Sequence, residues 1–220
     1  MTNLNENHLK NLKILPSKTR KLFLALSKKN FIKNFYLAGG TALVLEFGHR
    51  VSNDLDFFSE QKFNNNSLKR EVKKMGQWEA STEIENTLIG YLDNIKSSFF
   101  YLPYKLIEKP QYFNNLRIAS LADIALMKIL AISQRATKRD FVDLYVLSNE
   151  FIPLIDLIKL FPKKFGKFDY NLHHIIKSLV YFEEADCDKI PRMLINLDWK
   201  TTKQFFLKEQ ENLLQFLIRS

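Results

Sequence analysis

The sequence predicts an α/β protein in which a mixed β-sheet flanked by helices is followed by a C-terminal helical bundle. Short apolar runs broken by a glycine pair fill residues 35–58, and strand-like alternation fills 78–101. After about residue 118 the apolar spacing becomes helical. A hydrophobic content of 46% supplies enough apolar material for a core. We therefore place an α/β domain, including a basic N-terminal helical segment, at 1–115 and a helical domain at 116–220.

The first domain alternates helices and strands before a run of strands. The spacing predicts helices at 17–30, 41–48 and 65–76 and strands at 35–38, 54–58, 78–84, 87–92 and 95–102. Gly39 and Gly40 form the turn between the first strand and its helix, and Gly48 ends that helix. Pro103 and Pro110 mark the end of the sheet.

The second domain contains only predicted helices. They cover 120–135, 139–150, 153–161, 170–184 and 202–218. Pro153, Pro162 and Pro191 punctuate them, and the acidic stretch 183–191 is expected to be a connection.

Charge and composition limit the class of partner. The net charge is +9, of which residues 1–35 carry +7. A basic arm of this kind attracts polyanions such as nucleic acid, although a solvated helix face is the alternative. The sequence has no apolar run of membrane-spanning length, a polar N-terminus and a single cysteine, Cys187, which excludes an intrachain disulfide. We expect a cytoplasmic protein that does not associate with membranes.

Two aspartates lie in an apolar stretch soon after the glycine pair. Thirteen residues separate Gly40 from Asp54, within the string FYLAGGTALVLEFGHRVSNDLDFF. On a strand, residues i and i+2 point to the same face, so Asp54 and Asp56 present their carboxylates together. Adjacent like charges favour a bound cation, and oxygen ligands suit Mg²⁺ (or Mn²⁺). The alternative is a simple turn followed by two surface aspartates.

The glycine pair favours a phosphate beside that cation. A strand, the Gly39-Gly40 turn and a helix N-terminus present backbone N–H groups at the end of the sheet, and glycine lets a phosphate approach them. Thr41 adds a hydroxyl. A phosphate site next to metal-binding carboxylates predicts a nucleoside triphosphate site.

Two strings carry a family resemblance. Gly-Gly, thirteen residues and Asp-Leu-Asp resemble the signature of the polymerase-β-like nucleotidyltransferase superfamily. The fuller string LAGGTALVLEFGHRVSNDLDFF, together with LADIALMKILAISQRATKRDFVDLYVL, resembles its AbiEii/AbiGii-type branch, the toxins of type IV toxin–antitoxin and abortive-infection systems. The motifs cover residues 36–147. The resemblance implies a nucleotidyltransferase-like fold in which the helical domain contributes Lys128 and Asp140 to the site.

The resemblance also implies residue roles. In this family, Asp54 and Asp56 would bind the metal, and Gly39, Gly40 and Thr41 would bind the triphosphate. Catalysis would also require Lys128 and Asp140. Lys128 would neutralise phosphate charge, or it is a surface lysine whose stem covers apolar surface. Asp140 would orient the attacking hydroxyl or act as general base, whereas Asp143 more readily complements the helix dipole.

Several basic residues are further candidates for binding phosphate. Arg135, Lys138 and Arg139 cluster before Asp140 and would contact phosphates of the nucleotide or of RNA. Arg50 would either pair with Asp54 or contact phosphate, and the sequence leaves both open.

The chain departs from the superfamily pattern in one respect. Many members use a third carboxylate on a later strand, where this sequence offers Lys96 and Ser98. Asp93 is near but on the wrong side of a predicted turn. Either two aspartates suffice or Asp140 completes the site.

The predicted function is metal-dependent transfer of a nucleoside monophosphate from an NTP to an acceptor. RNA, at the 3′ end of tRNA, is the favoured acceptor, and a cognate antitoxin is the expected regulator. The alternatives are a nucleotidyltransferase acting on a small molecule or protein, and a non-catalytic module that binds nucleic acid or antitoxin.

Overall fold

The structure is a computed structural model that describes residues 3–4, 11–166 and 170–219. The chain forms two compact units, Met1–Ser120 and Leu121–Ser220. Lys10 and Glu6, which contribute to the charge of the predicted basic segment, lie outside the described residues. Among the described residues, none of the helices combines the length and hydropathy that crossing a bilayer requires.

The first unit is built on one mixed sheet of eight strands, in the order β1-β7-β8-β2-β3-β6-β5-β4. The strands are β1 (Asn3–Leu4), β2 (Tyr36–Ala38), β3 (Leu55–Ser59), β4 (Trp78–Ile84), β5 (Thr87–Leu92), β6 (Ile95–Tyr101), β7 (Gln111–Phe113) and β8 (Leu116–Ile118). The helices are η2 (Leu12–Ile14), α1 (Ser17–Ser27), η3 (Phe31–Asn34), α2 (Gly39–Phe47) and α3 (Asn65–Lys73). The predicted mixed sheet with flanking helices is confirmed.

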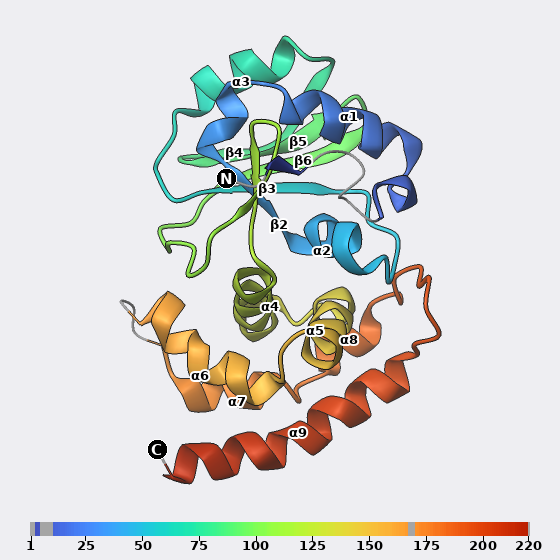
Figure 1. The fold of residues 1–220 in the computed structure, drawn as a ribbon, viewed down its shortest axis with the longest axis vertical. Coiled ribbons are helices and arrows are strands. Elements are labelled where there is room, and N and C mark those ends of the chain that lie inside the picture. The colour runs from blue at the N-terminus through green and yellow to red at the C-terminus, as the bar shows by residue number, and fades with distance from the viewer. Residues whose placement is uncertain (1–2, 5–10, 167–169, 220) are drawn as a thin grey trace. The chain divides into compact units, whose positions relative to one another are not determined.

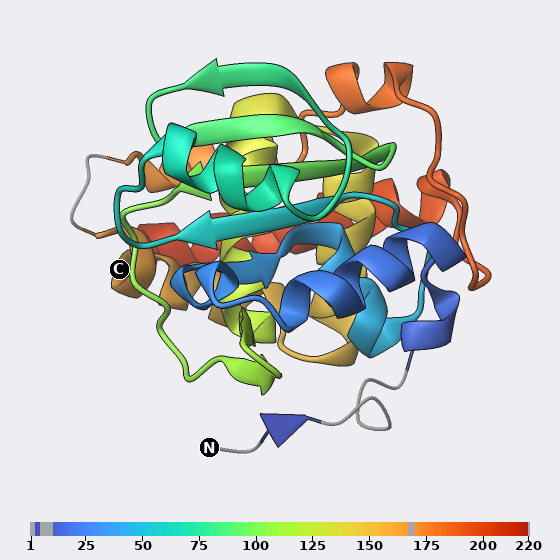
Figure 2. The same cartoon turned by 90° about the horizontal axis from the view of Figure 1, so that it is seen from above.

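Strand alternation gives the sheet two different faces. Leu55 and Phe57 are fully buried, whereas Asp54 and Asp56 are half-buried. Phe57 stacks on Phe99 of β6 with ring centroids 5.1 Å apart, and α1 and α3 lie on the same side of the sheet (Figures 1 and 2). The apolar face thus forms the core beneath these helices, while the acidic pair belongs to the opposite face.

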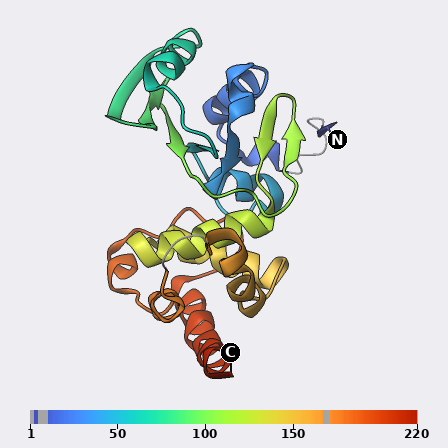
Figure 3. The same ribbon diagram turned by 90° about the vertical axis from the view of Figure 1, so that its left-hand side faces the viewer.

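The sequence prediction ended the sheet at Pro103 and Pro110, and this was wrong. The strands β7 and β8 form a further hairpin, which lies toward the opposite edge of the sheet from β4 (Figure 3). Each strand has only three residues, too few to show alternation, and Phe113 belongs to the core because its ring stacks on Phe23 of α1 at 5.3 Å.

The second unit is a bundle of helices, as predicted. They are α4 (Leu121–Arg135), α5 (Lys138–Glu150), α6 (Leu154–Phe165), α7 (Leu172–Ser178), α8 (Glu183–Cys187) and α9 (Trp199–Arg219). The predicted single helix at 170–184 is instead α7 and the start of α8. Phe182, at the N-cap of α8, packs on Phe141 and Trp199. The expected connection at 183–191 therefore begins as a helix.

Pro162 does not stop its helix, contrary to the prediction. The helix α6 continues through it to Phe165, although an interior proline costs about 3 kcal/mol. Phe161 and Phe165 are both buried with ring centroids 4.7 Å apart. The burial of these two rings offsets the lost backbone hydrogen bond.

Candidate nucleotide site

The first glycine of the pair brings the backbone against an acidic side chain. Gly39 begins α2 with φ of +69°, a left-handed conformation that glycine adopts without strain. Its neighbour Ala38 pairs with Asp56 in the β2–β3 register, and a Cβ on Gly39 would lie 3.1 Å from Asp56 Oδ2. The predicted turn therefore places the α2 N-terminus directly beside a metal-ligand candidate.

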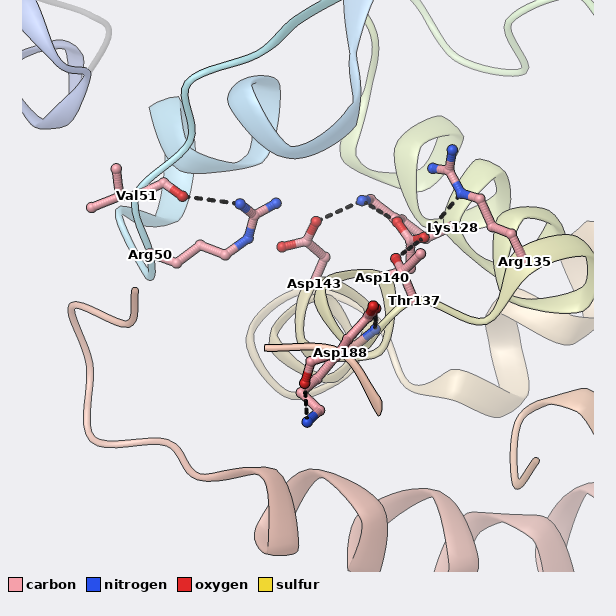
Figure 4. Close-up of polar contacts among 9 residues, drawn as sticks. Arg50, Val51, Lys128, Arg135, Thr137, Asp140, Asp143 and Asp188 are labelled. Atoms are coloured by element: carbon pink, nitrogen blue, oxygen red, sulfur yellow. Dashed lines mark hydrogen bonds and ion pairs between the residues drawn. The ribbon is translucent and has the colours of Figure 1, made fainter. Parts of the chain in front are cut away.

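The second glycine makes room for a guanidinium. A Cβ on Gly40 would lie 2.1 Å from Arg50 Nη2, closer than any side chain permits. Arg50 is 4% exposed, and its Nη1 donates to the Val51 carbonyl at 3.0 Å (Figure 4). A fixed cation and a helix N-terminus, both positive, meet at this glycine, which is the arrangement that attracts an anion.

The Thr41 side chain contacts other parts of the protein and does not face solvent. Its side chain is buried, its hydroxyl is 2.9 Å from Ser52 Oγ, and it donates to the Asp54 carbonyl. The hydroxyl thus fixes the loop that carries Asp54, and its predicted contact with phosphate stays a prediction. Ser52 was missed by sequence reasoning, and only its position two residues before Asp54 hints at this role.

Asp54 and Asp56 form the acidic part of the site. The β3–β6 register places Ser98 beside Asp56, and Lys96 lies two residues earlier on the same face of β6. Within the described residues, no group of three acidic, histidine or cysteine side chains is arranged to hold a metal ion. The carboxylate chemistry still fits Mg²⁺, which binds through one or two carboxylates and takes its other ligands from phosphate and water.

The second unit holds a buried ionic cluster (Figure 4). Lys128 Nζ lies 2.7 Å from Asp140 Oδ1 and 2.6 Å from Asp143 Oδ2. The three side chains are only 7%, 1% and 0% exposed, respectively. Lys128 is therefore not a surface lysine, and Asp143 does more than complement a helix dipole. The i, i+3 spacing of the aspartates on α5 is the signal that brings both to one ammonium.

Asp140 is held as an anion. Burial raises its pKa, but the charges of Lys128 and Arg135 and hydrogen bonds from Lys128 and Thr137 outweigh burial and bring the pKa below its ordinary value. Asp140 Oδ2 accepts two hydrogen bonds, one from Thr137 Oγ1 at 2.6 Å and one from Arg135 Nε at 3.3 Å. A carboxylate with a lowered pKa is a weak base, so this geometry favours an orienting role over general-base catalysis.

The predicted basic cluster divides into two kinds of residue. Arg139 is exposed, and the Arg135 side chain is 62% exposed, so both can reach a ligand. Lys138 is buried instead, and its Nζ donates to the Asp188 carbonyl at 2.6 Å and lies 5.2 Å from the Trp199 ring centroid. The expectation that Lys138 binds phosphate is not supported, because it anchors the segment after α8.

The structure thus groups the predicted residues within each unit. Gly39, Gly40, Arg50 and Asp56 meet in the first unit, and Lys128, Arg135 and Asp140 meet in the second. Whether Lys128 and Asp140 complete the metal site stays a prediction.

A mixed sheet with a strand, a Gly-Gly turn, a helix and an Asp-x-Asp strand beside it defines a nucleotidyltransferase-like protein. Sequence comparison agrees, because the family model described as nucleotidyl transferase AbiEii toxin, type IV TA system, matches residues 20–101 and 91–217. The chain belongs to this family and is a nucleotidyltransferase.

Individual relatives extend the comparison. The uncharacterised protein aq_aa25 of Aquifex aeolicus (strain VF5) is 41% identical over 187 residues, which cover 83% of this chain and 89% of the relative. MenT4, a nucleotidyltransferase toxin of Mycobacterium tuberculosis H37Rv, has a similar fold with a TM-score of 0.55 at 14% identity, covering 96% of this chain and 93% of that one. A Helicobacter pylori crystal structure gives a TM-score of 0.50 at 17% identity over 98% of both chains.

Proposed function

We propose that this protein transfers a nucleoside monophosphate from an NTP to the 3′ end of RNA, with tRNA as the acceptor. The observation that carries the choice of RNA is the set of exposed lysines on the unit that holds Asp54 and Asp56. They are Lys13, Lys18, Lys21, Lys28, Lys29 and Lys33. Such a basic surface attracts the phosphate backbone of nucleic acid, and the resulting affinity falls as the salt concentration rises.

The triphosphate is assigned to the N-terminus of α2. Gly39 leaves the backbone open on the side of Asp56, and Arg50 adds a guanidinium against Gly40. Backbone N–H groups, the helix dipole and a buried cation all favour negative charge at this point. Arg135 and Arg139 are proposed as further phosphate contacts, because their side chains reach solvent.

Asp54 and Asp56 would hold the Mg²⁺ (or Mn²⁺). When bound there, the ion supplies charge neutralisation for the triphosphate and the leaving pyrophosphate.

The chain's own residues then orient the reaction. The acceptor hydroxyl oxygen forms a bond to the α-phosphorus, the bond from that phosphorus to the bridging oxygen of pyrophosphate breaks, and the hydroxyl proton passes to solvent. We assign Asp140 and Lys128 a role in orienting the reacting groups, since their charges are mutually fixed. Catalysis of this kind consists mostly of positioning and electrostatic stabilisation.

The biological part of the proposal follows from the family. A protein that adds nucleotides to tRNA ends would block translation, so we propose that it acts as a toxin in the cytoplasm and is restrained by a cognate antitoxin.

A transfer assay with a matched pair of variants tests the proposal. Purified protein is mixed with bulk tRNA, Mg²⁺ and each α-³²P-labelled NTP in turn. We expect label on tRNA with the wild-type protein and with Glu79→Gln, an exposed carboxylate-to-amide change on β4. We expect none with Asp56→Asn, which keeps the side-chain shape and removes the metal-binding charge.

Other outcomes would redirect the proposal. Label on a small molecule or on protein would keep the chemistry and overturn the RNA acceptor. Equal labelling by Asp56→Asn and wild type would overturn the assignment of the metal carboxylates. Chelation of divalent metal without loss of labelling would overturn the metal requirement.

A further inference from the structure

The first unit also has a concave site, and none of its lining residues belongs to the glycine turn. It is a cavity of about 440 Å³, within the size range of small-ligand pockets. Its lining comes from η3, the end of β3 and the β7–β8 hairpin: Lys33, Asn34, Ser59, Glu60, Gln61, Tyr112, Asn114, Asn115 and Arg117. All of these side chains are polar or charged, which excludes a purely apolar ligand.

The strand register places two of these residues on the face that carries Asp56. Tyr112 pairs with Arg117, Arg117 with Tyr36, and Tyr36 with Phe58, so all four share one face of the sheet. Phe58 and Asp56 are two apart on β3 and share that face. From strand spacing and rise, the Cα atoms of Arg117 and Asp56 lie about 12 Å apart. Tyr112 and Arg117 therefore join the cavity to the face that carries the acidic pair, whereas Ser59 belongs to the opposite face of β3.

Internal bonds leave the cavity with an excess of positive charge. Glu60 is already committed, because its Oε1 accepts from the Leu106 amide at 2.9 Å and its Oε2 from Arg117 Nη1 at 3.2 Å. Arg117 also lies 5.7 Å from the Tyr36 ring centroid, and its Nε is buried without a hydrogen-bond partner. Lys33 is exposed and adds a second positive charge, so the site suits an anion.

The asparagines add fixed neutral groups. Asn114 Nδ2 donates to Ser27 Oγ at 2.9 Å, and Asn115 Nδ2 donates to the Lys28 carbonyl at 3.1 Å. These bonds anchor the hairpin tip to the end of α1 and leave the amide oxygens as acceptors. An amide oxygen accepts from base amino groups, and an aromatic ring such as Tyr112 stacks on bases. Cation, amide and ring together match a nucleotide better than a simple anion.

We propose that this cavity binds a nucleotide of the single-stranded acceptor RNA upstream of its reacting 3′ end. Lys33 and Arg117 take the phosphate, and Tyr112 and the asparagines contact the base. The proposal rests on RNA as the acceptor and assigns a place where the strand is held while its end reaches Asp56. The exposed Lys28 and Lys29 next to Asn115 continue the basic surface from the cavity.

The test measures RNA binding apart from catalysis. Fluorescence anisotropy with a short single-stranded RNA, without NTP or metal, compares wild type, Lys33→Glu and the control Lys73→Glu, an exposed charge reversal on α3. We expect Lys33→Glu to weaken RNA binding about tenfold and to lower the salt slope by about 0.7, the value for one lost single-strand contact. We expect Lys73→Glu to bind within about twofold of wild type.

A second variant and a second ligand complete the design. Tyr112→Ala, which removes the ring and keeps the charges, is expected to weaken RNA binding several-fold. NTP binding, measured separately for each variant, is expected to match wild type, because the glycine turn is untouched. Nucleoside monophosphate alone is expected to bind much more weakly than RNA.

Each contrary result has its own meaning. If Lys33→Glu and Tyr112→Ala both bind RNA like Lys73→Glu, the cavity assignment is overturned while the proposed reaction stands. If the monophosphate binds as tightly as RNA and both variants lose it, the cavity binds a free nucleotide and the acceptor role is overturned. Loss of NTP binding or of transfer to every acceptor by the wild type would instead count against the proposed function.

Discussion

Replacing Lys128 by methionine removes the one cation that two buried carboxylates share in this cluster. Asp140 Oδ1 and Asp143 Oδ2 both lie within 2.7 Å of Lys128 Nζ, so the two oxygens are at most about 5 Å apart. Methionine retains the length of the side chain and removes its charge. With an effective dielectric constant of about 20, the repulsion left behind is about 3 kcal/mol. Breaking a buried pair typically costs about 3–5 kcal/mol, which agrees.

The assay is urea unfolding followed by tryptophan fluorescence. Trp199 is in the second unit and Trp78 in the first, so a Trp78→Phe background reports on the second unit alone. We expect Lys128→Met to lower the unfolding free energy by about 3 kcal/mol at neutral pH. The loss should shrink as the pH falls, because a proton taken up by one of the two carboxylates removes a repelling charge. Once one carboxylate is protonated, the repulsion and the destabilisation it causes are relieved.

Two further variants make the result specific. Lys159→Met removes a half-exposed lysine that pairs with Asp156 at 2.8 Å, and we expect a change below about 0.5 kcal/mol. Adding Asp143→Asn to Lys128→Met should restore part of the loss, since it removes one of the repelling charges. A Lys128→Met protein as stable as the Lys159→Met protein, or a loss that is the same at every pH, would refute the electrostatic reasoning.

Three other predictions concern single groups. Gly39→Ala places a residue with a Cβ in a left-handed backbone conformation next to Asp56. Urea unfolding should therefore show a loss of about 1–2 kcal/mol in the unfolding free energy, and a binding titration should show a weaker NTP affinity. Unchanged values would contradict the assigned turn. Thr41→Val removes the hydroxyl that donates to the Asp54 carbonyl, and urea unfolding should show a loss of about 1–3 kcal/mol in the unfolding free energy. If the loop that carries Asp54 shifts, kcat should fall by a larger factor than KM rises. Asp140→Asn should lower the unfolding free energy by its full amount above about pH 4, the pKa of the carboxyl group in the unfolded chain. The difference from wild type should shrink as the pH falls from there through the lower pKa of the folded state. A difference that is constant down to about pH 2 would argue against a lowered pKa.

The sequence predicted those elements in which periodicity and punctuation agree. The strands at 78–84 and 87–92 occur with the predicted bounds, and Gly48 caps α2 in the left-handed conformation that its position indicated. Prediction failed where packing overrides local signals. Pro162 lies inside a helix whose Phe161 and Phe165 rings are buried, and α7 ends at Ser178, four residues before Phe182, whose ring packs on Phe141.

The candidate site shows the same division. Residues that belong to a spaced motif, such as Gly39 and Asp56, are found in contact distance of one another as the pattern implied. Residues that hold the motif in place, such as Ser52, could not be predicted in this way. Serine is common in loops, so its presence there does not indicate which group its hydroxyl contacts. The buried pair of Lys164 with Asp123, 2.6 Å apart and joining α6 to α4, was equally invisible, since the partners are far apart in the sequence.

The two units differ in the balance of charge around their aspartates. In the second unit, Lys128 lies against both Asp140 and Asp143, and Lys128 and Arg135 bring the pKa of Asp140 below its ordinary value. In the first unit, the neighbouring strand β6 places Ser98 beside Asp56 and Lys96 two residues earlier on the same face. We expect a divalent ion that Asp54 and Asp56 bind together with a nucleotide to stabilise the first unit and to leave the stability of the second unchanged. Metal-dependent thermal stabilisation that Asp56→Asn abolishes and Asp143→Asn retains is the pattern that this balance predicts.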